Sequence, residues 1–160
     1  MRILVLTKPV PDPAAGAERL GPDFRLDRTA SPSVVNGNDE YALEAALQLV
    51  EAHGGEVAIL SMAPASGTDT MRKALARGAL RGVLVTDPAL AGADLPATIR
   101  VIAAAAAQEP FDLLLTGLDT SDGQGGAVAA GVAARLGLPL LSTAGAISRE
   151  RAAMIPLRLG

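Results

Sequence analysis

The stretch Leu113–Gly126, LLLTGLDTSDGQGG, joins an apolar run to a polar loop that is rich in glycine. The run from Phe111 to Thr116 is typical of a fully buried strand in a parallel sheet. From Gln124 onward, the spacing of apolar residues predicts a helix. A strand, a glycine loop and a helix start can together bind an anion. The first backbone N–H groups of a helix are free, and glycine lets a ligand approach the backbone.

The same loop also has a purely structural interpretation. Ser121 and Gln124 have the Ser-x-x-Gln spacing of a capping box, and Asp122 would lie in the first helical turn, where the helix dipole favours a carboxylate. The glycine spacing matches neither a Walker A motif nor Gly-x-Gly-x-x-Gly. Taken alone, the loop leaves a ligand site and a plain helix start both open.

The composition excludes several classes of function. The chain has 160 residues, the length of one domain, and 49% of them are hydrophobic although it contains only two Phe, one Tyr and no Trp. The core must therefore be aliphatic, and aromatic platforms for nucleic-acid bases are absent. A net charge of −3 also argues against nucleic acid or anionic lipid as the main partner.

Reactive and metal-binding side chains are scarce. The chain has no cysteine and a single histidine, His53, which we expect at the solvent end of a helix. Disulfides and thiolate metal sites are excluded, and a histidine-based metal site or a Ser-His-Asp triad is disfavoured. With neither a signal-peptide pattern nor a segment long enough to span a membrane, the sequence predicts a soluble, cytoplasmic protein.

Strand and helix patterns alternate along the chain. This alternation predicts a three-layer, Rossmann-like α/β fold around a parallel sheet. An irregular region with short extended pieces near Phe24–Arg28 and Ser33–Val35 separates the first strand from the first helix. The expected strands are Arg2–Thr7, Glu56–Met62, Gly82–Thr86, Phe111–Thr116 and Pro139–Thr143. The expected helices run from a cap at Asn38 or Asp39 to Ala52, and over Thr70–Arg77, Leu95–Gln108 and Gln124–Leu136.

The same patterns predict the domain organisation. We expect residues 1–145 to form the α/β domain and residues 146–160 to begin a C-terminal excursion that is incomplete in this chain. A hairpin is one interpretation of this excursion. In an open parallel sheet the ligand crevice lies at the carboxyl ends of the strands, where the strand order reverses. We expect the first strand to be central, with the strand near residue 113 beside it. The crevice would be walled by Leu6–Lys8, Ser61–Met62, Asn36–Asp39 and the loop from Gly117. Such a crevice can hold a phosphate at helix N-termini and an adenine between aliphatic walls.

Four segments of the chain carry recognisable motifs. They are Lys8-x-Val10-Pro11-Asp12, then Asn36-x-x-Asp39-Glu40-Tyr41-Ala42-x-Glu44-x-Ala46-Leu47, then Thr70–Ala79, and finally Phe111-Asp112-Leu113-x-Leu115-x-Gly117 with Asp122-Gly123 and Leu136-Gly137-Leu138-Pro139. In order and spacing, over about residues 1–145, these segments resemble one known family, the beta subunit of electron transfer flavoproteins.

The resemblance implies a domain similar to the adenine nucleotide alpha hydrolases in fold, which binds AMP structurally and has no catalytic residue of its own. In that family the beta subunit pairs with an alpha subunit that carries most of the FAD contacts. The heterodimer accepts electrons from acyl-CoA or other dehydrogenases. Carried onto this sequence, the AMP site would comprise Leu6, Asn36, Gly37, Asn38, Asp39, Met62, Gly117, Asp122, Gly123, Gln124, Gly125, Gly126 and Val128.

The chain departs from the family pattern at the loop. The family's proline after Asn36 is Gly37, and Leu118-Asp119-Thr120-Ser121 replaces a basic residue and adds a carboxylate near the expected phosphate. Gly125 and Ala127 stand where the family has Thr and Gln. Each lost side-chain hydrogen bond is worth about 0.5–1.5 kcal/mol, so nucleotide affinity could fall about tenfold or more. The family also continues for roughly a hundred further residues.

Three alternatives remain open from the residues. The first is an assembly module of the same fold with an empty or weak crevice. The second is an enzyme that hydrolyses a nucleotide at its α-phosphate, although the Ser-Gly-Gly-x-Asp-Ser loop expected after the first strand is replaced by Lys8-Pro9-Val10-Pro11-Asp12. The third is a universal-stress-type ATP binder, whose Gly-x-x-Gly spacing is not met.

Overall fold

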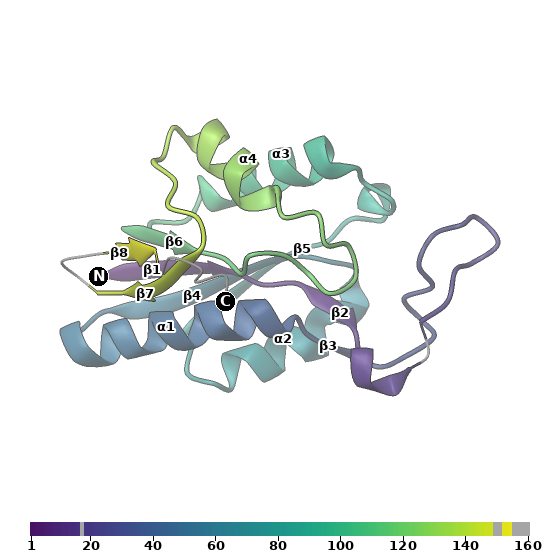
Figure 1. Ribbon diagram of the computed structural model, residues 1–160, viewed down its shortest axis with the longest axis horizontal. Coiled ribbons are helices and arrows are strands. Elements are labelled where there is room, and N and C mark those ends of the chain that lie inside the picture. Colours follow the sequence, from purple (N-terminus) through teal and green to yellow (C-terminus); the bar gives the residue numbers. More distant parts are fainter. Residues whose placement is uncertain (17, 149–151, 155–160) are drawn as a thin grey trace, which may run out of the picture.

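A parallel sheet flanked by helices forms the centre of the protein (Figure 1). The structure, a computed structural model, describes residues 1–16, 18–148 and 152–154. Within these residues, the central sheet has four strands in the order β5-β4-β1-β6. Their bounds are β1 (Arg2–Leu6), β4 (Glu56–Met62), β5 (Arg81–Val85) and β6 (Leu113–Leu115). All three strand pairings are parallel, which confirms the predicted sheet with its first strand in the interior.

Helices cover both faces of this sheet (Figure 1). On one face lie α1 (Gly37–His53) and α2 (Thr68–Leu75), and on the other lie α3 (Leu95–Ala106) and α4 (Val128–Leu136). Short 3-10 turns precede α2 and α3, at η2 (Ala65–Gly67) and η3 (Pro88–Leu90). The three-layer α/β fold expected from the sequence is confirmed. Within the described residues, no helix is both long and apolar enough to cross a membrane.

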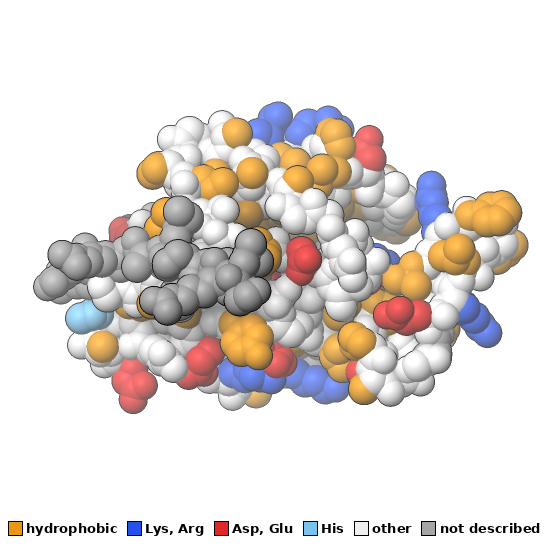
Figure 2. All heavy atoms as spheres, in the orientation of Figure 1, with side chains coloured by type: hydrophobic (Ala, Val, Ile, Leu, Met, Phe, Trp, Pro, Cys, Tyr) orange, Lys and Arg blue, Asp and Glu red, His pale blue; other side chains and the backbone are white. Residues whose placement is uncertain are grey.

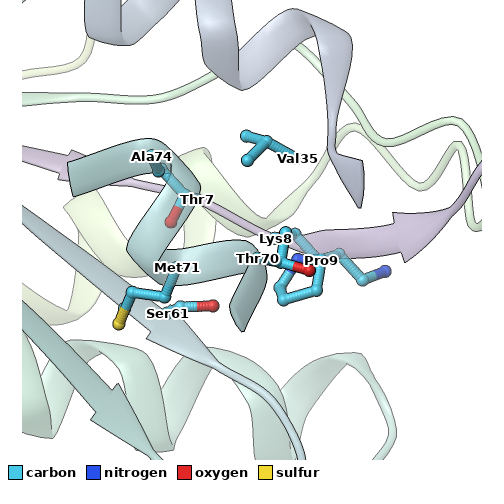
Figure 3. A pocket seen from close by; sticks show the side chains of 8 residues that line it. All are labelled: Thr7, Lys8, Pro9, Val35, Ser61, Thr70, Met71 and Ala74. Atoms are coloured by element: carbon cyan, nitrogen blue, oxygen red, sulfur yellow. The ribbon is translucent and has the colours of Figure 1, made fainter. Parts of the chain in front are cut away.

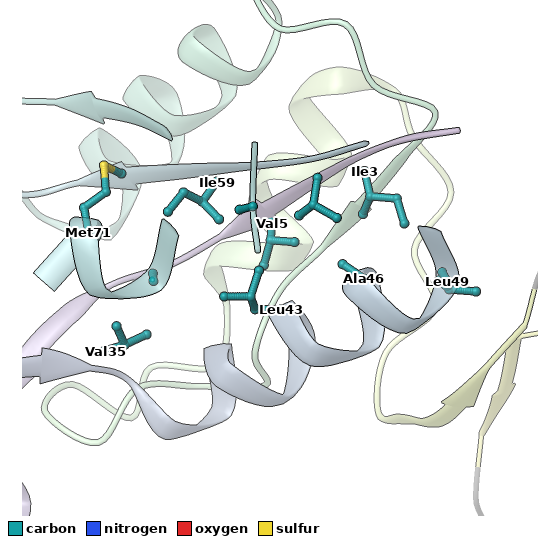
Figure 4. Packing of buried hydrophobic residues seen from close by; sticks show 11 residues of the cluster. Ile3, Val5, Val35, Leu43, Ala46, Leu49, Ile59 and Met71 are labelled. Carbon is teal, nitrogen blue, oxygen red and sulfur yellow. The ribbon is translucent and has the colours of Figure 1, made fainter. Parts of the chain in front are cut away.

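The buried faces are aliphatic, as the composition requires (Figure 4). Under α1, Ile3 and Val5 of β1 pack against Leu43 and Ala46, which are fully buried. A smaller cluster on the opposite face of the sheet combines Leu4, Leu6, Leu60 and Ala106. Burying each large aliphatic side chain contributes about 1.5–3 kcal/mol, so this packing determines which face of each helix meets the sheet.

A second, antiparallel pair of strands leads away from the sheet. β2 (Pro9–Pro11) pairs with β3 (Ser33–Val35), and the described residues between them project from the body of the molecule (Figure 1). The extended piece expected at Ser33–Val35 is confirmed. The one expected near Phe24–Arg28 is reduced to a single bridge between Leu20 and Leu26. The 3-10 turn η1 (Pro13–Ala15) begins this projection, which we call the arm (residues 12–32).

The first helix starts earlier than predicted. Asn36 occupies the N-cap position of α1, not Asn38 or Asp39, and its side chain makes no capping hydrogen bond. Asp39 lies in the first turn but is 5% exposed and faces the sheet. The helix ends at His53, one residue beyond the predicted Ala52, with Gly54 as its C-cap, and His53 is exposed at this end, as predicted.

The glycine loop differs from its prediction in two ways. β6 is shorter than the expected Phe111–Thr116 and only half-buried. It is an edge strand of the described sheet, where it pairs with β1 alone. The following helix begins at Val128 and not at Gln124, because Gln124 and Gly126 have positive φ angles of 45° and 56°. The capping box of Ser121 and Gln124 therefore does not form.

The predicted fifth strand, Pro139–Thr143, is also wrong. These described residues belong to no strand, and Thr143 has a φ of 54°, which an extended strand does not allow. Instead β7 (Ala144–Ile147) pairs antiparallel with β8 (Ala152–Met154), forming a hairpin in the region where one was considered. Residues 149–151 and 155–160 of the expected excursion lie outside the described residues. The boundary at residue 145 stays a prediction.

The contact between α3 and α4 depends on a glycine. A Cβ atom at Gly131 would collide with the side chain of Ile99. We expect Gly131→Ala to lower the free energy of unfolding by about 1–3 kcal/mol through overpacking, although alanine favours a helix by about 1 kcal/mol over glycine. Urea denaturation of the purified variant measures this change.

Ile99→Ala provides the control through a double-mutant cycle. Removing the isoleucine branches makes room for the new methyl group, so the double variant should be more stable than the sum of the two single changes predicts. Strict additivity would show that Gly131 is not needed for the helix contact.

Candidate functional site

An open cleft of ≈ 240 Å³ lies next to the point where the strand order reverses between β1 and β6. One wall is apolar and comes mainly from the β2–β3 pair. The other wall is polar and comes from the start of α1 and the loop after β6. The lining residues are Val10, Pro13, Val34, Val35, Asn36, Gly37, Asn38, Asp119, Ser121 and Gln124.

Asn36 ties the glycine loop to the start of α1. Its side chain is buried, and Nδ2 donates to the backbone oxygen of Asp119 at 2.8 Å. In return, the backbone N–H of Ser121 donates to Asn36 Oδ1 at 3.1 Å. The Asn36 backbone N–H also donates to the carbonyl of Lys8 at 3.0 Å, at the end of β1. The side chain predicted to bind AMP is thus already satisfied by the protein itself.

Asp39 joins the ends of the two strands that flank the reversal. Its Oδ2 accepts the backbone N–H of Lys8 at 2.8 Å, and the same carboxylate accepts the backbone N–H of Gly117. Burial raises the pKa of Asp39 to about 6, although these hydrogen bonds, one from Asn36 and the charge of Lys8 act in the opposite direction. A Cβ atom at Gly117 would collide with this carboxylate, so glycine is required there.

Asp122 connects three segments through ion pairs. Lys8 Nζ donates to Asp122 Oδ1 at 2.8 Å, and Arg28 of the arm contacts Oδ2. The Asp122 side chain is fully buried in these contacts. Burial opposes ionisation of this carboxyl group, but hydrogen bonds from Lys8 and Thr120, the charge of Lys8 and a hydrogen bond from Arg28 outweigh it and lower the pKa. Lys8, which could have reached a phosphate, is instead paired with Asp122.

The thirteen residues expected at the AMP site are only partly brought together. Four of them line the cleft: Asn36, Gly37, Asn38 and Gln124. Asp39, Gly117 and Asp122 lie behind its wall and hold the backbone in place. Gly123, Gly125 and Gly126 are exposed on the loop that leads to Val128. Leu6 is packed in the core with Leu60, and Met62 is not among the lining residues. Contact with AMP stays a prediction for all of them.

The sequence reasoning did not assign the apolar wall to the site. Val10 lies beside Val34 because β2 pairs with β3, and Pro13 and Val35 line the cleft with them. The available signal was that both segments are short, apolar and separated by a long irregular stretch. Asp119 was noted only as a departure from the family, and its side-chain contact with Asn38 was not foreseen.

A second hollow, on the α2 side of the sheet, is closed (Figure 3). Thr7, just after β1, lines it together with Ser61 of β4 and Thr70 of α2, and it leaves no room for a water molecule. Ser61 Oγ is buried there without a hydrogen-bond partner in the described part of the chain. The hollow is therefore a packing feature. Among the residues with described positions, no cluster of three His, Asp or Glu side chains could hold a metal ion.

The parallel sheet, its two helical layers and the cleft at the strand-order reversal define a Rossmann-like α/β domain, with its cleft at the place where open α/β sheets commonly bind ligands. A profile of the Electron transfer flavoprotein domain matches residues 23–158. The chain therefore belongs to the electron transfer flavoprotein family, among the beta-type subunits.

Individual relatives agree with this assignment. The chain is 44% identical to the protein FixA of Azorhizobium caulinodans over 86% of its own length and 50% of the relative. It is 38% identical to the electron transfer flavoprotein subunit beta of Thermoanaerobacterium thermosaccharolyticum, covering 87% of this chain and 53% of that one. It is 37% identical to the electron transfer flavoprotein subunit beta of Mycobacterium bovis, covering 92% of this chain and 58% of that one. The chain thus spans about half the length of the curated relatives it matches.

The buried carboxyl group of Asp39 predicts a specific pH dependence of stability. Because its folded-state pKa is raised from 3.8 to about 6, its contribution to stability is complete below about pH 4 and is lost as the pH rises through about 6. Between about pH 5 and about pH 7.5, wild-type protein should lose about 1–1.5 kcal/mol from this group. Asp39→Asn should lack this component, as measured by urea denaturation at both pH values.

Asp69→Asn is the matched control, because this carboxyl group is on α2 with its side chain 83% exposed. Its variant should follow the pH curve of the wild type. If Asp39→Asn also follows that curve, the carboxyl group of Asp39 does not titrate near pH 6.

Proposed function

We propose that the chain is a non-catalytic beta-type subunit that binds AMP as a structural nucleotide and supports electron transfer by an FAD-carrying alpha subunit. The observation that carries this proposal is the cleft at the strand-order reversal in a chain of this family. The flavin would supply the electron transfer. The residues of this chain would bind the nucleotide and present a surface to the partner, in a cytoplasmic heterodimer that serves acyl-CoA or other dehydrogenases.

The cleft fits the nucleoside part of AMP. Its apolar lining of Val10, Val34 and Val35 suits one face of a base, and Asn38 and Gln124 also line the cleft, with amides that suit the polar edge. Its volume of ≈ 240 Å³ is slightly below the roughly 300–1,000 Å³ of common small-molecule sites, so part of the ligand would remain in solvent.

The loop offers donors for a phosphate through its backbone. Within the described residues, the N–H groups of Gly125, Gly126 and Ala127 donate no hydrogen bond. A Cβ atom at Gly125 or Gly126 would meet nothing within 4 Å, so the space beside the loop is open. Free N–H groups just before α4 are a suitable environment for an anion. Since Lys8 and Arg28 are paired with Asp122, these donors would hold the phosphate without a free cation, which favours modest affinity.

An apolar surface supports the proposed partner. Leu138, Leu140 and Leu141, which follow α4, are 37%, 50% and 47% exposed. Figure 2 shows hydrophobic side chains gathered over α4 and the loop that follows it. Contiguous exposed leucines are typical of surfaces that another protein covers. The same surface also favours the second candidate, an assembly module whose cleft stays empty because Asn36 and Lys8 already have partners within the chain.

Two experiments test whether the protein binds AMP: analysis of its bound ligand, and a variant that blocks the cleft. Denatured wild-type protein should release AMP, identified by mass spectrometry, or added AMP should raise its melting temperature. Gly37 lines the cleft and has open space around it, so Gly37→Leu should fill the cleft and lower AMP affinity about tenfold or more.

Ala52→Leu adds the same side chain at the exposed far end of α1 and should leave AMP affinity unchanged. Wild-type protein that releases no AMP and gains no thermal stability from millimolar AMP would overturn the nucleotide proposal and favour the assembly module.

Co-expression tests the partner. We expect this chain to co-purify with an electron transfer flavoprotein alpha subunit as a complex with flavin absorbance. Leu140→Asp should weaken the complex by at least about tenfold, because a carboxylate would be buried without a partner. Leu80→Asp, at another exposed leucine, immediately before β5, is the control. An alpha subunit that elutes alone, with all its flavin, would contradict the proposed heterodimer.

A further inference from the structure

We infer that Asp119 sets the nucleotide selectivity of the cleft, and that its carboxylate favours a nucleoside monophosphate over the corresponding di- and triphosphates. This inference rests on the nucleotide binding proposed above. It follows from the position and surroundings of that carboxylate.

The Asp119 carboxylate is fixed at the wall of the cleft. Its Oδ1 accepts a hydrogen bond from Asn38 Nδ2 at 2.6 Å, and both residues line the cleft. The backbone oxygen of Asp119 is held at 2.8 Å by Asn36 Nδ2, which is buried. Because backbone and side chain are both held, the carboxylate cannot easily turn away from an incoming ligand.

No lysine or arginine among the described lining residues offsets this charge. Lys8 and Arg28, the cations that contact the same loop, both pair with Asp122, whose side chain is fully buried. Asn38, the side-chain partner of Asp119, is neutral. The cleft therefore presents a negative charge on its polar wall, while the N–H groups that could hold a phosphate belong to the glycines further along the loop.

Each additional phosphate charge then increases the repulsion. Two unit charges about 8 Å apart, at an effective dielectric constant of about 40–80, change affinity by about two- to sixfold. A monophosphate can place its single group at the Gly125–Ala127 backbone. A diphosphate or triphosphate brings more charge into a loop that offers no free cation within the described residues. The expected order of affinity is AMP, then ADP, then ATP.

Asp119→Asn isolates the charge. Asparagine has nearly the same shape, and its Oδ1 can still accept the hydrogen bond from Asn38. Binding of adenosine, AMP, ADP and ATP without magnesium is measured by calorimetry for both proteins. We expect the ratio of ATP to AMP dissociation constants to fall about fivefold in the variant, with adenosine affinity changed less than about twofold.

Salt and a charge-matched variant complete the test. Raising sodium chloride from about 50 mM to about 0.5 M should narrow the ATP-to-AMP ratio in wild-type protein, because the repulsion is screened, and have less effect in Asp119→Asn. Glu51→Gln changes the net charge equally, at an exposed position near the C-terminal end of α1, and should behave as wild type.

The possible failures can be distinguished. If Asp119→Asn binds AMP and keeps the wild-type ratio at both salt concentrations, the selectivity assigned to Asp119 is wrong while nucleotide binding stands. If neither protein binds any of the four compounds at millimolar concentration, the proposed nucleotide function is wrong and the selectivity falls with it.

Discussion

The carboxylate of Asp39 receives two backbone N–H groups that the sheet itself cannot pair. Lys8 and Gly117 stand where β1 and β6 end and their chains turn to different parts of the molecule, so their N–H groups leave the ladder. A buried donor without an acceptor costs about 1–3 kcal/mol. One side chain from the first turn of α1 satisfies both donors and fixes the helix against the sheet. The burial that raises the pKa of Asp39 is the consequence of this position, and Gly117 is required because any larger residue would displace the carboxylate.

Two further polar side chains extend this arrangement to the loop and the arm. Asn36 binds the loop at Asp119 and Ser121, and Asp122 binds Lys8 and Arg28. These contacts link segments more than eighty residues apart in the sequence. The cleft is thus formed by hydrogen bonds and ion pairs within the chain. A ligand would enter a site whose walls already have their positions, which reduces the entropy that binding must overcome.

The sequence predicted the elements whose pattern is local. The alternation of strands and helices, the interior position of β1 and the cleft at the reversal follow from hydrophobic periodicity and from the rules of parallel sheets. The start of α4 was misplaced because positive φ angles at Gln124 and Gly126 carry no signal in apolar spacing. The apolar wall was missed because Val10 and Val34 pair across the arm. Each segment is recognisable as short and apolar, but neither local pattern shows that the two segments pair. The resemblance to the family supplied candidate residues. It could not distinguish the residues that line the cleft from those that fix the surrounding backbone.

That separation is clearest in the three aspartates. Asp39 is surrounded by backbone donors, Asp122 by cations, and Asp119 by the amide of Asn38 at the cleft wall. In the sequence, Asp119 and Asp122 belong to one polar loop and look equivalent. Their environments make Asp122 a buried counter-ion that withdraws Lys8 and Arg28 from any ligand, and leave Asp119 as a charge on the cleft wall. In the proposed nucleotide site, the glycines of the loop would hold a phosphate and the Asp119 carboxylate would limit how much further negative charge the cleft accepts, because Asp119 meets a neutral amide where Asp122 meets two cations.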